Sequence, residues 1–531
     1  MVLVGTTTNE RHVTGRATLC VAAVLALALP LAAASPAADR AFNQFWRATT
    51  PAEASKAVAA IVKAGGGFDE TLALLKRGRP YAFDVPRGVL RLSHVIGGTT
   101  FPYMLDVPTS YDPAKRYQVR IQLHGGVGRP EVMQRPNGIG PMAGAEQIYI
   151  LPGAWSEAEW WTNMQLENLR WILDSVKRTY NVDENRVVMS GVSDGGTGTY
   201  YFSMRDTTPF AAFLPLNGAV AVLRGSSALV HGEMFPNNFL NKPFFIVNGG
   251  LDPLYPTALV EPYIQQMQKS GVTLTYLPQP NAVHNTAWWP EVKDTYEAFV
   301  HDHPRQPIPE TLTWESDLTG GTDRAHWLVI DTLARPRANA AALADVNDMI
   351  GTESESNFGI RNNGTRVTAV TPGSNAAAFG LLPGDVIAKI DARAIPSGLD
   401  VLDLLFLIDP GTPVSLTVTR DGAVRVLSGT YRPTTAPRIA SMFLHNRPSG
   451  RVDLVRRGND ITATTRGVGS FTLLLSPDVF DFSKPVTVTA DGKRVFDGRV
   501  TKSIETLLTW TARDNDRTML FGAELKVILT P

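Results

Sequence analysis

Between residues 80 and 305, short apolar runs alternate with longer stretches that have helical periodicity. The apolar runs predict strands because they are rich in β-branched or aromatic residues and almost continuously apolar, as strands buried on both faces are. They cover residues 119–123, 148–151, 186–189, 212–216, 244–247 and 274–277. The clearest helix is predicted over 164–180, where leucine and valine recur at three- and four-residue spacing. The alternation is typical of βαβ units and predicts an α/β fold with a mainly parallel sheet flanked by helices.

The pattern changes near residue 305, where Pro304, Pro307 and Pro309 end the last helical stretch. Beyond it, strands and turns alternate, and an Asp491-Gly492 pair between two β-branched runs predicts a hairpin. Strand-like residues 311–335 are expected to pair with 436–531. The predicted division is a helical extension at 39–89, the α/β domain at 90–308, the first strands of a C-terminal β-domain at 309–339, an inserted small domain at 340–432, and a β-rich domain at 433–531.

Residues 1–38 have the features of a cleavable secretory signal. Arg11 and Arg16 precede an apolar run at 17–34, which ends in small residues before Asp39. An uncleaved membrane anchor is the alternative, but the run is short and contains Pro30. We therefore expect an exported protein, periplasmic or secreted, with no stable membrane span after the signal is cleaved.

Composition narrows the possible partners and cofactors. Of 531 residues, 44% are hydrophobic, which is sufficient for a large core, and 50 Lys plus Arg balance 50 Asp plus Glu. Without a basic excess, nucleic acid is not an expected partner. The single cysteine, Cys20, lies in the expected signal, so the mature chain would have no disulfide and no thiol chemistry. We assign no cofactor and no metal; the pair His301 and His303 falls at a predicted helix end.

A Gly-x-Ser-x-Gly pattern, Gly191 to Gly195 around Ser193, directly follows the predicted strand at 186–189 and opens a possible helix. A tight strand-to-helix turn holds its central residue in a strained conformation and needs flanking residues without a Cβ. Such a turn is typical of a nucleophilic serine. The alternative is an ordinary glycine-rich turn in which the serine is only solvated.

The chain also supplies the groups that such a serine requires, each at the end of a predicted strand. Asp252 follows the strand at 244–247, and His284 follows the strand at 274–277. The order Ser, Asp, His is that of α/β-hydrolases. Gly125 and Gly126 follow the strand at 119–123, where a glycine-rich loop can turn a backbone N–H toward a substrate carbonyl.

Three segments resemble the α/β-hydrolase superfamily, and within it secreted esterases similar to polyhydroxyalkanoate depolymerases and feruloyl or acetylxylan esterases. They are Leu-His-Gly-Gly at 123–126, Tyr-Asn-Val-Asp-Glu-Asn-Arg-Val at 180–187 and Ser-Gly-Val-Ser-Asp-Gly-Gly at 190–196. The resemblance implies an α/β-hydrolase fold. By this resemblance Ser193 would be the nucleophile, His284 the general base and Asp252 the orienting acid. The backbone N–H groups of Asp194 and of Gly125 or Gly126 would form the oxyanion hole.

Residues within 340–432 resemble a PDZ domain of the bacterial protease type. The resemblance is carried by Phe-Gly-Ile at 358–360, Pro-Gly-Ser-Asn-Ala-Ala at 372–377 and Gly-Leu-Leu-Pro-Gly-Asp-Val-Ile at 380–387. Such domains add an extended peptide to a sheet edge and bind its C-terminal carboxylate with backbone N–H groups. By this resemblance the carboxylate loop would be Phe358, Gly359 and Ile360. A PDZ fold that serves only as a spacer is the alternative.

Together these features predict an exported serine hydrolase that cleaves small or polymeric carboxylic esters through an acyl-enzyme intermediate, with a PDZ module for peptide recognition or regulation. Two other functions stay open. The same three groups can cleave amides in a serine peptidase of the prolyl-oligopeptidase type, and the chain could be a PDZ-centred binding protein with an idle hydrolase fold.

Overall fold

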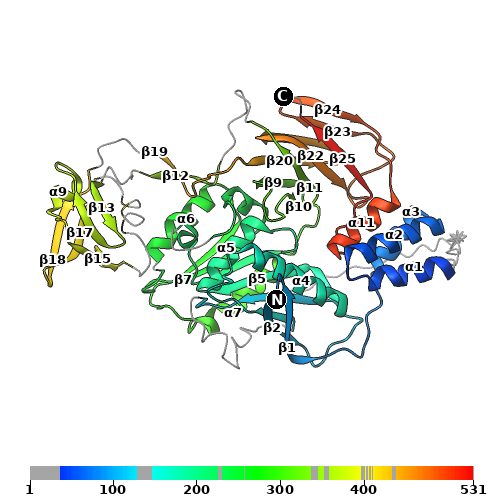
Figure 1. Cartoon of the computed structure of the whole chain (residues 1–531), viewed down its shortest axis with the longest axis horizontal. Coiled ribbons are helices and arrows are strands. Elements are labelled where there is room, and N and C mark those ends of the chain that lie inside the picture. The colour runs from blue at the N-terminus through cyan, green and yellow to red at the C-terminus, as the bar shows by residue number, and fades with distance from the viewer. Residues whose placement is uncertain are drawn as a thin grey trace, which may run out of the picture.

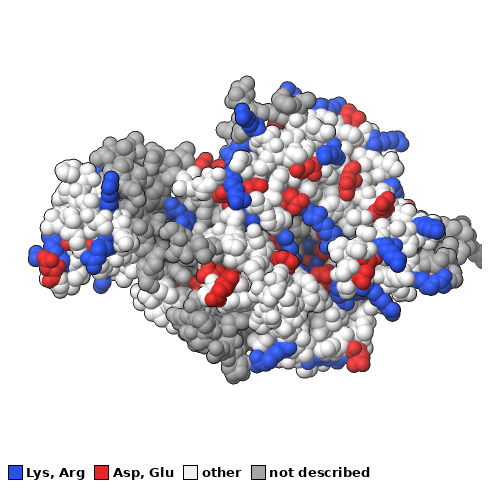
Figure 2. Space-filling model, viewed as in Figure 1, with Lys and Arg blue, Asp and Glu red and all other residues white. Residues whose placement is uncertain are grey.

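The structure is a computed structural model, and it describes the chain with several gaps (Figure 1). The described residues are 36–127, 146–224, 230–255, 257–335, 345–351, 358–395, 401, 405, 408, 411–432 and 438–529. On the face shown in Figure 2, basic and acidic side chains are interspersed, in keeping with the balanced composition. No helix of the described residues is long and apolar enough to cross a membrane. The expected signal at 1–38 lies almost entirely outside them.

An eight-stranded sheet forms the centre of the molecule (Figure 1). Its strands are β1 (Gly88–Ile96), β2 (Thr99–Val107), β3 (Tyr117–Leu123), β4 (Ile148–Pro152), β5 (Val182–Val192), β6 (Ala212–Leu216), β7 (Phe244–Gly249) and β8 (Leu274–Gln279). The order is β1-β2-β4-β3-β5-β6-β7-β8, and from β4 to β8 all pairs are parallel, while β2 runs antiparallel to both neighbours. The six predicted strands are all present, and the expected α/β-hydrolase fold is confirmed.

The central strands of the sheet are buried on both faces because successive residues contact different helices. Val187 and Phe213 join a core with α4 (Asn163–Thr179), α5 (Asp194–Arg205) and α6 (Thr257–Lys269). Val188 and Leu214 join a second core with α7 (Trp289–Asp302) on the opposite face. Two short 3₁₀ helices, η2 (Val220–Arg224) and η3 (Pro236–Asn241), lie between β6 and β7. This packing explains why the strand sequences show no polar alternation.

The β1–β2 hairpin is absent from the sequence-based prediction. β1 is an edge strand and is mostly exposed, so its sequence is not continuously apolar. The hairpin turns at Gly97 and Gly98, whose φ angles are 55° and 84°. A tight two-residue hairpin turn requires positive φ at both positions, so the glycine pair was the feature of the sequence that indicated this hairpin.

The N-terminal extension forms three helices, α1 (Pro36–Arg47), α2 (Pro51–Ala64) and α3 (Phe68–Arg77). Thr50 caps α2 by accepting a hydrogen bond from the Glu53 backbone, and the Glu53 side chain bonds back to Thr50. Gly65, in the left-handed conformation, ends α2. The three helices share a core with α11 (Ile504–Asp514), so segments from the two ends of the described chain pack together (Figure 1).

The C-terminal β-domain contains two sheets. One has the order β24-β23-β21-β20-β9, and the other β10-β11-β22-β25. The strands are β9 (Thr311–Ser316), β10 (Arg324–Ala325), β11 (Leu328–Leu333), β20 (Gly450–Arg457), β21 (Asp460–Arg466), β22 (Val468–Leu475), β23 (Val486–Ala490), β24 (Lys493–Gly498) and β25 (Ala523–Ile528). β9 pairs with β20 and β11 with β22, as expected for strands on either side of an insertion. The predicted hairpin at Asp491-Gly492 is the β23–β24 turn.

The inserted domain is a small sheet that extends to one side of the molecule (Figure 1). Its strands run in the order β13-β14-β15-β17-β18, with β16 beside β15. They are β13 (Ile360–Asn363), β14 (Arg366–Val370), β15 (Val386–Ile390), β16 (Arg393–Ala394), β17 (Pro413–Arg420) and β18 (Ala423–Thr430), with helix α9 (Asn375–Phe379). Its own core includes Phe358, Leu416 and Tyr431.

A two-stranded ribbon, β12 (Asp348–Gly351) with β19 (Arg438–Ser441), connects the inserted domain to the rest of the chain. Its base is tied to the hydrolase domain. The Val346 N–H donates to Asn237 Oδ1 at 2.9 Å, and Gln266 Nε2 donates to the Asp348 carbonyl at 2.9 Å. The ring of His445 bonds the Met234 carbonyl at 2.7 Å. The ribbon is therefore fixed to α6 and to the segment that leads into β7.

Buried ion pairs join the hydrolase domain to the C-terminal β-domain. Arg305 Nη2 lies 2.7 Å from Asp516 Oδ2, and Arg517 Nε lies 2.6 Å from Glu184 Oε1. All four side chains are at most 7% exposed. Because removing one partner of such a pair leaves an uncompensated buried charge, the two domains are expected to unfold together.

His326, in the turn between β10 and β11, is buried beside several cations. Its Nδ1 lies 2.9 Å from the Pro307 carbonyl, so this nitrogen carries the hydrogen. Burial first, and then the positive charges of Lys242, Arg305 and Arg324, hold the pKa of His326 well below its usual value. The ring is neutral in the folded protein.

We predict a pH dependence of stability that originates at His326. The unfolded chain takes up this proton below about pH 6.5, whereas the folded chain does not, so the contribution is complete above pH 6.5 and is lost as the pH falls. The slope is at most about 1.4 kcal/mol per pH unit. In calorimetry between pH 7.5 and 5, His326→Asn should show a smaller decrease in Tm than the wild type. The exposed control His301→Asn should follow the wild type, and parallel curves for His326→Asn would contradict the assignment.

Candidate active site

Ser193 occupies the turn between the end of β5 and the start of α5. Its φ and ψ are 58° and −121°, a strained conformation for a residue with a side chain. The Ser193 N–H donates to the Leu216 carbonyl at 2.9 Å, and its carbonyl accepts from Thr197 N–H at 2.9 Å. The turn is therefore held from β6 and from the first turn of α5.

The two glycines of the pattern are required by close backbone contacts. A Cβ on Gly191 would overlap the Gly195 carbonyl, and a Cβ on Gly195 would overlap the Leu123 carbonyl at the end of β3. The small residues let the turn pack against the neighbouring strand, which places Ser193 beside the loop that follows β3.

His284 and Asp252 meet Ser193 at this edge of the sheet. His284 Nε2 lies 2.8 Å from Ser193 Oγ, and His284 Nδ1 lies 2.6 Å from Asp252 Oδ2. β5, β7 and β8 are parallel, so the loops after them leave the sheet at the same edge. Residues distant in sequence thus form one chain of hydrogen bonds.

The Asp252 carboxylate is fixed before it meets the histidine. It is 2% exposed, and its Oδ1 accepts hydrogen bonds from the N–H groups of Leu254 at 2.8 Å and Tyr255 at 3.0 Å. These bonds leave Oδ2 directed at His284. A carboxylate in this position fixes the imidazole so that Nδ1 carries the hydrogen and Nε2 faces the serine.

Two of the expected oxyanion residues, Asp194 and Gly125, lie next to Ser193. Asp194 is the first residue of α5, where helix N–H groups lack acceptors within the helix. Gly125 lies directly against the serine, since a Cβ there would come within 2.7 Å of Ser193 Cβ. Gly126 follows with φ 71°. The start of α5 and the glycine loop therefore both adjoin Ser193.

His124 supports the loop that carries Gly125, a role that the sequence analysis did not assign to it. Its Nδ1 lies 2.9 Å from the Gly125 carbonyl and its Nε2 accepts from Ala154 N–H at 3.0 Å, so the ring is neutral with hydrogen on Nδ1. Burial lowers its pKa. Trp160 Nε1 also donates to the His124 carbonyl at 2.8 Å. These bonds fix the loop that carries Gly125.

The Asp194 side chain connects the same loop to the Asp252 loop. Its Oδ2 accepts from Val127 N–H at 2.9 Å and its Oδ1 from Tyr255 Oη at 3.4 Å. Burial and then the charges of Asp194 and Asp252 raise the pKa of Tyr255, so the phenol keeps its proton and donates. The sequence contains no strong signal for this link. Asp194 stands out only as a residue of the serine motif, and Tyr255 only as a tyrosine near Asp252.

We predict that Gly125→Ala reduces kcat by about 10²- to 10³-fold, the cost of losing one oxyanion donor. The added Cβ would press on Ser193 Cβ at 2.7 Å and on the Val192 carbonyl at 3.0 Å, displacing the loop. Ester hydrolysis kinetics and Tm should be measured together. Gly67→Ala, where a Cβ meets nothing within 4 Å, is the matched control. An unchanged kcat for Gly125→Ala would show that this loop is not part of the site.

The other histidine pair considered in the sequence lies away from this site. His301 is exposed on the last turn of α7, and His303 stacks on Phe299 and bonds the Phe299 carbonyl at 2.7 Å. Within the described ranges, no cluster of three His, Cys, Asp or Glu side chains suits a metal ion.

In the inserted domain, the side chains of Phe358 and Ile360 are buried in the core, and only backbone remains for a ligand at these positions. Gly359 has φ 83°, and a Cβ there would overlap the Ser374 side chain. Ile360 begins β13, which is an edge strand. The edge has the form that strand addition requires.

Residues 349–428 match the PDZ domain family, which confirms the resemblance in this region. Among curated proteins, the magnetosome formation protease MamE of Paramagnetospirillum magneticum is 33% identical over 109 residues, 19% of this chain and 15% of that protein. The metalloprotease MmpA of Caulobacter vibrioides is 37% identical over 101 residues, 19% and 23% respectively. The bifunctional acetylxylan esterase/xylanase XynS20E of Neocallimastix patriciarum is 29% identical over 102 residues, 18% and 15%. The matches span less than a quarter of each relative.

Solved structures similar to this chain are esterases and hydrolases. A thermostable esterase matches with 19% identity and a TM-score of 0.32, covering 41% of this chain and 63% of that one. A ferulic acid esterase matches with 17% identity and a TM-score of 0.33, covering 40% and 97%. S-formylglutathione hydrolase FrmB from Staphylococcus aureus matches with 15% identity and a TM-score of 0.31, covering 41% and 98%. These TM-scores are too low to define the fold, which follows instead from the strand order of the chain itself.

That strand order and the strained serine turn define an α/β-hydrolase fold, and the hydrogen-bonded Ser–His–Asp arrangement is that of serine hydrolases. The chain joins this fold to a PDZ domain at 349–428 and to a β-rich domain built from segments on both sides of it.

Proposed function

We propose that the protein is an exported serine hydrolase of carboxylic esters, with Ser193 as nucleophile, His284 as general base and Asp252 as orienting acid. The observation that carries the proposal is the chain of two hydrogen bonds, 2.8 Å from Ser193 to His284 and 2.6 Å from His284 to Asp252. A complete, oriented chain of this kind at a strained turn has no evident structural need.

In the proposed reaction, Ser193 Oγ attacks the ester carbonyl carbon while its proton passes to His284 Nε2. The carbonyl oxygen becomes an oxyanion, which the N–H groups of Asp194 and of Gly125 or Gly126 stabilise. His284 then gives its proton to the leaving alcohol as the C–O bond breaks, which leaves an acyl-serine. Water repeats the sequence, releasing the carboxylic acid and restoring Ser193.

Esters are favoured over amides by the resemblance of the serine motif to secreted esterases. The described part of the connection between β6 and β7 holds two short 3₁₀ helices and no separate cap domain. This favours access for a bulky or polymeric ester as well as a small one.

The proposed activity is tested with a chain-length series of nitrophenyl esters and one peptidyl anilide. The expected result is ester turnover that exceeds anilide turnover. An anilide rate above that of a matched ester would favour a peptidase, and turnover of neither substrate would favour a PDZ-centred binding protein.

For the PDZ domain we propose binding of a peptide C-terminus along β13, with the backbone of Phe358, Gly359 and Ile360 near the carboxylate. The support is the edge position of β13 and the family match. Fluorescence anisotropy with a peptide library should show binding of free C-termini and loss of affinity for the amidated peptides. Equal affinities would contradict recognition of the carboxylate, and binding of neither set would leave the domain as a spacer.

Export is proposed from the basic residues and the apolar run at 17–34. Expression in a bacterial host followed by N-terminal sequencing of the exported protein should show a mature chain that begins close to Asp39. Retention of the full-length chain in the membrane fraction would favour the uncleaved anchor.

A further inference from the structure

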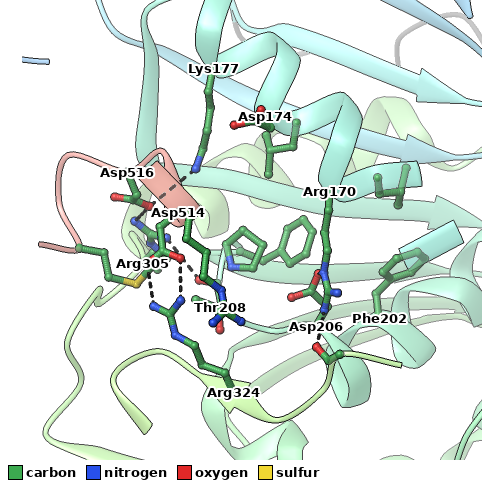
Figure 3. A pocket seen from close by; sticks show the side chains of 17 residues that line it. Arg170, Asp174, Lys177, Phe202, Asp206, Thr208, Arg305, Arg324, Asp514 and Asp516 are labelled. Carbon is green, nitrogen blue, oxygen red and sulfur yellow. Dashed lines mark hydrogen bonds and ion pairs between the residues drawn. The ribbon is translucent and has the colours of Figure 1, made fainter. Parts of the chain in front are cut away.

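A cavity of about 300 Å³ lies between the hydrolase domain and the loop that follows α11 (Figure 3). Figure 2 shows a hollow lined by charges of both signs in the corresponding region of the surface. Phe210, which lines the cavity, precedes β6, whereas Ser193 follows the carboxyl end of β5. The cavity is therefore at the opposite edge of the sheet from the proposed active site, and none of the three proposed catalytic residues lines it.

Most charges in the cavity wall are paired one to one. Arg170 Nε lies 2.7 Å from Asp206 Oδ2, and Arg324 bonds both carboxylate oxygens of Asp514 at 2.6 and 2.7 Å. Figure 3 shows both pairs, with Arg324 below Lys177 and Arg170 to its right. Each pair is neutral overall, so neither leaves a charge for a ligand.

Lys177 is paired less closely than these residues. Figure 3 shows its side chain reaching from α4 toward Asp516. The side chain is 7% exposed, and its Nζ forms a long ion pair with Asp516 Oδ2 at 3.7 Å, too far for a hydrogen bond. Among the described residues the ammonium donates no hydrogen bond.

Asp516 is already neutralised by another cation. Its Oδ2 accepts from Arg305 Nη2 at 2.7 Å, and its Oδ1 accepts from the Thr518 N–H at 2.9 Å and hydroxyl at 2.8 Å. Its pKa is held below the usual range, chiefly by the charges of Arg305 and Lys177 against the effect of burial. One carboxylate thus faces two cations.

The remaining carboxylate near Lys177 is also occupied. Asp174 lies 2.6 Å from Arg178 Nε and accepts from Asn515 Nδ2 at 2.9 Å. At the exposed side of the cavity, Arg513 stacks on the Trp510 ring at 4.9 Å and forms no ion pair within the described ranges. The wall therefore carries a surplus of positive charge, because Lys177 has only a long contact with a carboxylate that Arg305 already pairs, and a buried charge that is poorly compensated is unfavourable.

Most of the remaining wall is apolar, formed by Leu169, Leu173, Phe202, Phe210 and Met519 among others. We propose that this cavity binds a small amphiphilic carboxylate, whose anionic group accepts hydrogen bonds from Lys177 and pairs with Arg513 while its carbon chain or ring contacts the apolar wall. The volume is at the lower end of the range for small-molecule sites, about 300–1,000 Å³. The ligand can be a free metabolite or a carboxylic acid released by hydrolysis.

Calorimetric titration of the Ser193→Ala protein tests the site without any turnover, so the result does not depend on the proposed activity. Hexanoate and benzoate are compared with hexanol and benzyl alcohol, which lack the charge, and with inorganic phosphate, which lacks the apolar part. We expect the carboxylates to bind at least 10-fold more tightly than either comparison set. Equal affinity for the alcohols, or for phosphate, would overturn the proposal.

Two substitutions in the Ser193→Ala background assign the binding to this cavity rather than to the oxyanion region. Lys177→Met should raise the Kd for hexanoate at least 10-fold, and Arg513→Gln, at an exposed position, should raise it several-fold. Lys56→Met, an exposed lysine on α2, is the control and should leave the Kd unchanged. Should Lys177→Met fail to fold, Arg513→Gln decides. A Kd that the folded variants leave unchanged would contradict the site.

A comparison of carboxylates distinguishes the two sources of ligand. Acids that correspond to the acyl groups hydrolysed fastest are expected to bind most tightly if the ligand is the product. If unrelated carboxylates bind more tightly, the same cavity serves a free metabolite.

Discussion

Ser193→Ala is expected to abolish ester hydrolysis, lowering kcat by about 10⁴- to 10⁶-fold. The change removes the oxygen that lies 2.8 Å from His284 Nε2 and leaves the backbone bonds of Ser193 to Leu216 and Thr197 in place. The variant should therefore fold normally, with a Tm close to that of the wild type. The measurement is steady-state hydrolysis of the best nitrophenyl ester, together with a thermal melt.

Ser203→Ala is the matched control for this loss. Ser203 lies on the same helix, α5, and its hydroxyl donates to the Tyr200 carbonyl at 2.8 Å, away from His284. It should retain wild-type turnover. If Ser193→Ala keeps near-full activity, another group is the nucleophile and the proposed mechanism is wrong.

Asp252→Asn should lower kcat by about 10⁴-fold while leaving KM much less affected. The amide oxygen can replace Oδ1 as acceptor for Leu254 and Tyr255, which directs the NH₂ group toward His284 Nδ1. That nitrogen must then accept, so the hydrogen moves to Nε2. A His284 that carries hydrogen on Nε2 cannot take the proton of Ser193.

The second His–Asp pair in the chain supplies a control for Asp252→Asn. His301 Nδ1 lies 2.9 Å from Asp302 Oδ1, but both side chains are exposed at the end of α7. Asp302→Asn should leave kcat unchanged. Equal small effects of the two substitutions would show that Asp252 does not orient the base.

The sequence predicted the centre of the fold because burial leaves a clear pattern there. β6, most of β7 and the second half of β5 are covered on both faces, so these parts are mainly apolar, and Ser193 and Asp252 stand just beyond β5 and β7. The same reasoning missed β1, whose exposed edge position produces no such run. It expected one helical extension at 39–89, where the Thr50 cap and Gly65 divide three helices.

Other parts of the site depend on side-chain hydrogen bonds that no sequence spacing encodes. The support of the glycine loop by His124, and the link from Asp194 to Tyr255, arise from loops that meet only in the folded chain. The surplus charge at Lys177 follows from which carboxylates Arg305 and Arg178 already occupy. Such contacts can be predicted only when the positions of both partners in the folded chain are known.

The central claim, that Ser193 is a nucleophile activated by His284, is tested most directly by covalent labelling with a fluorophosphonate. The protein is incubated with the reagent and its peptides are mapped by mass spectrometry. We predict one adduct per chain, on the peptide that contains Ser193, and no adduct in Ser193→Ala. Absence of labelling in the folded wild-type protein, or labelling that persists in Ser193→Ala, would contradict the account.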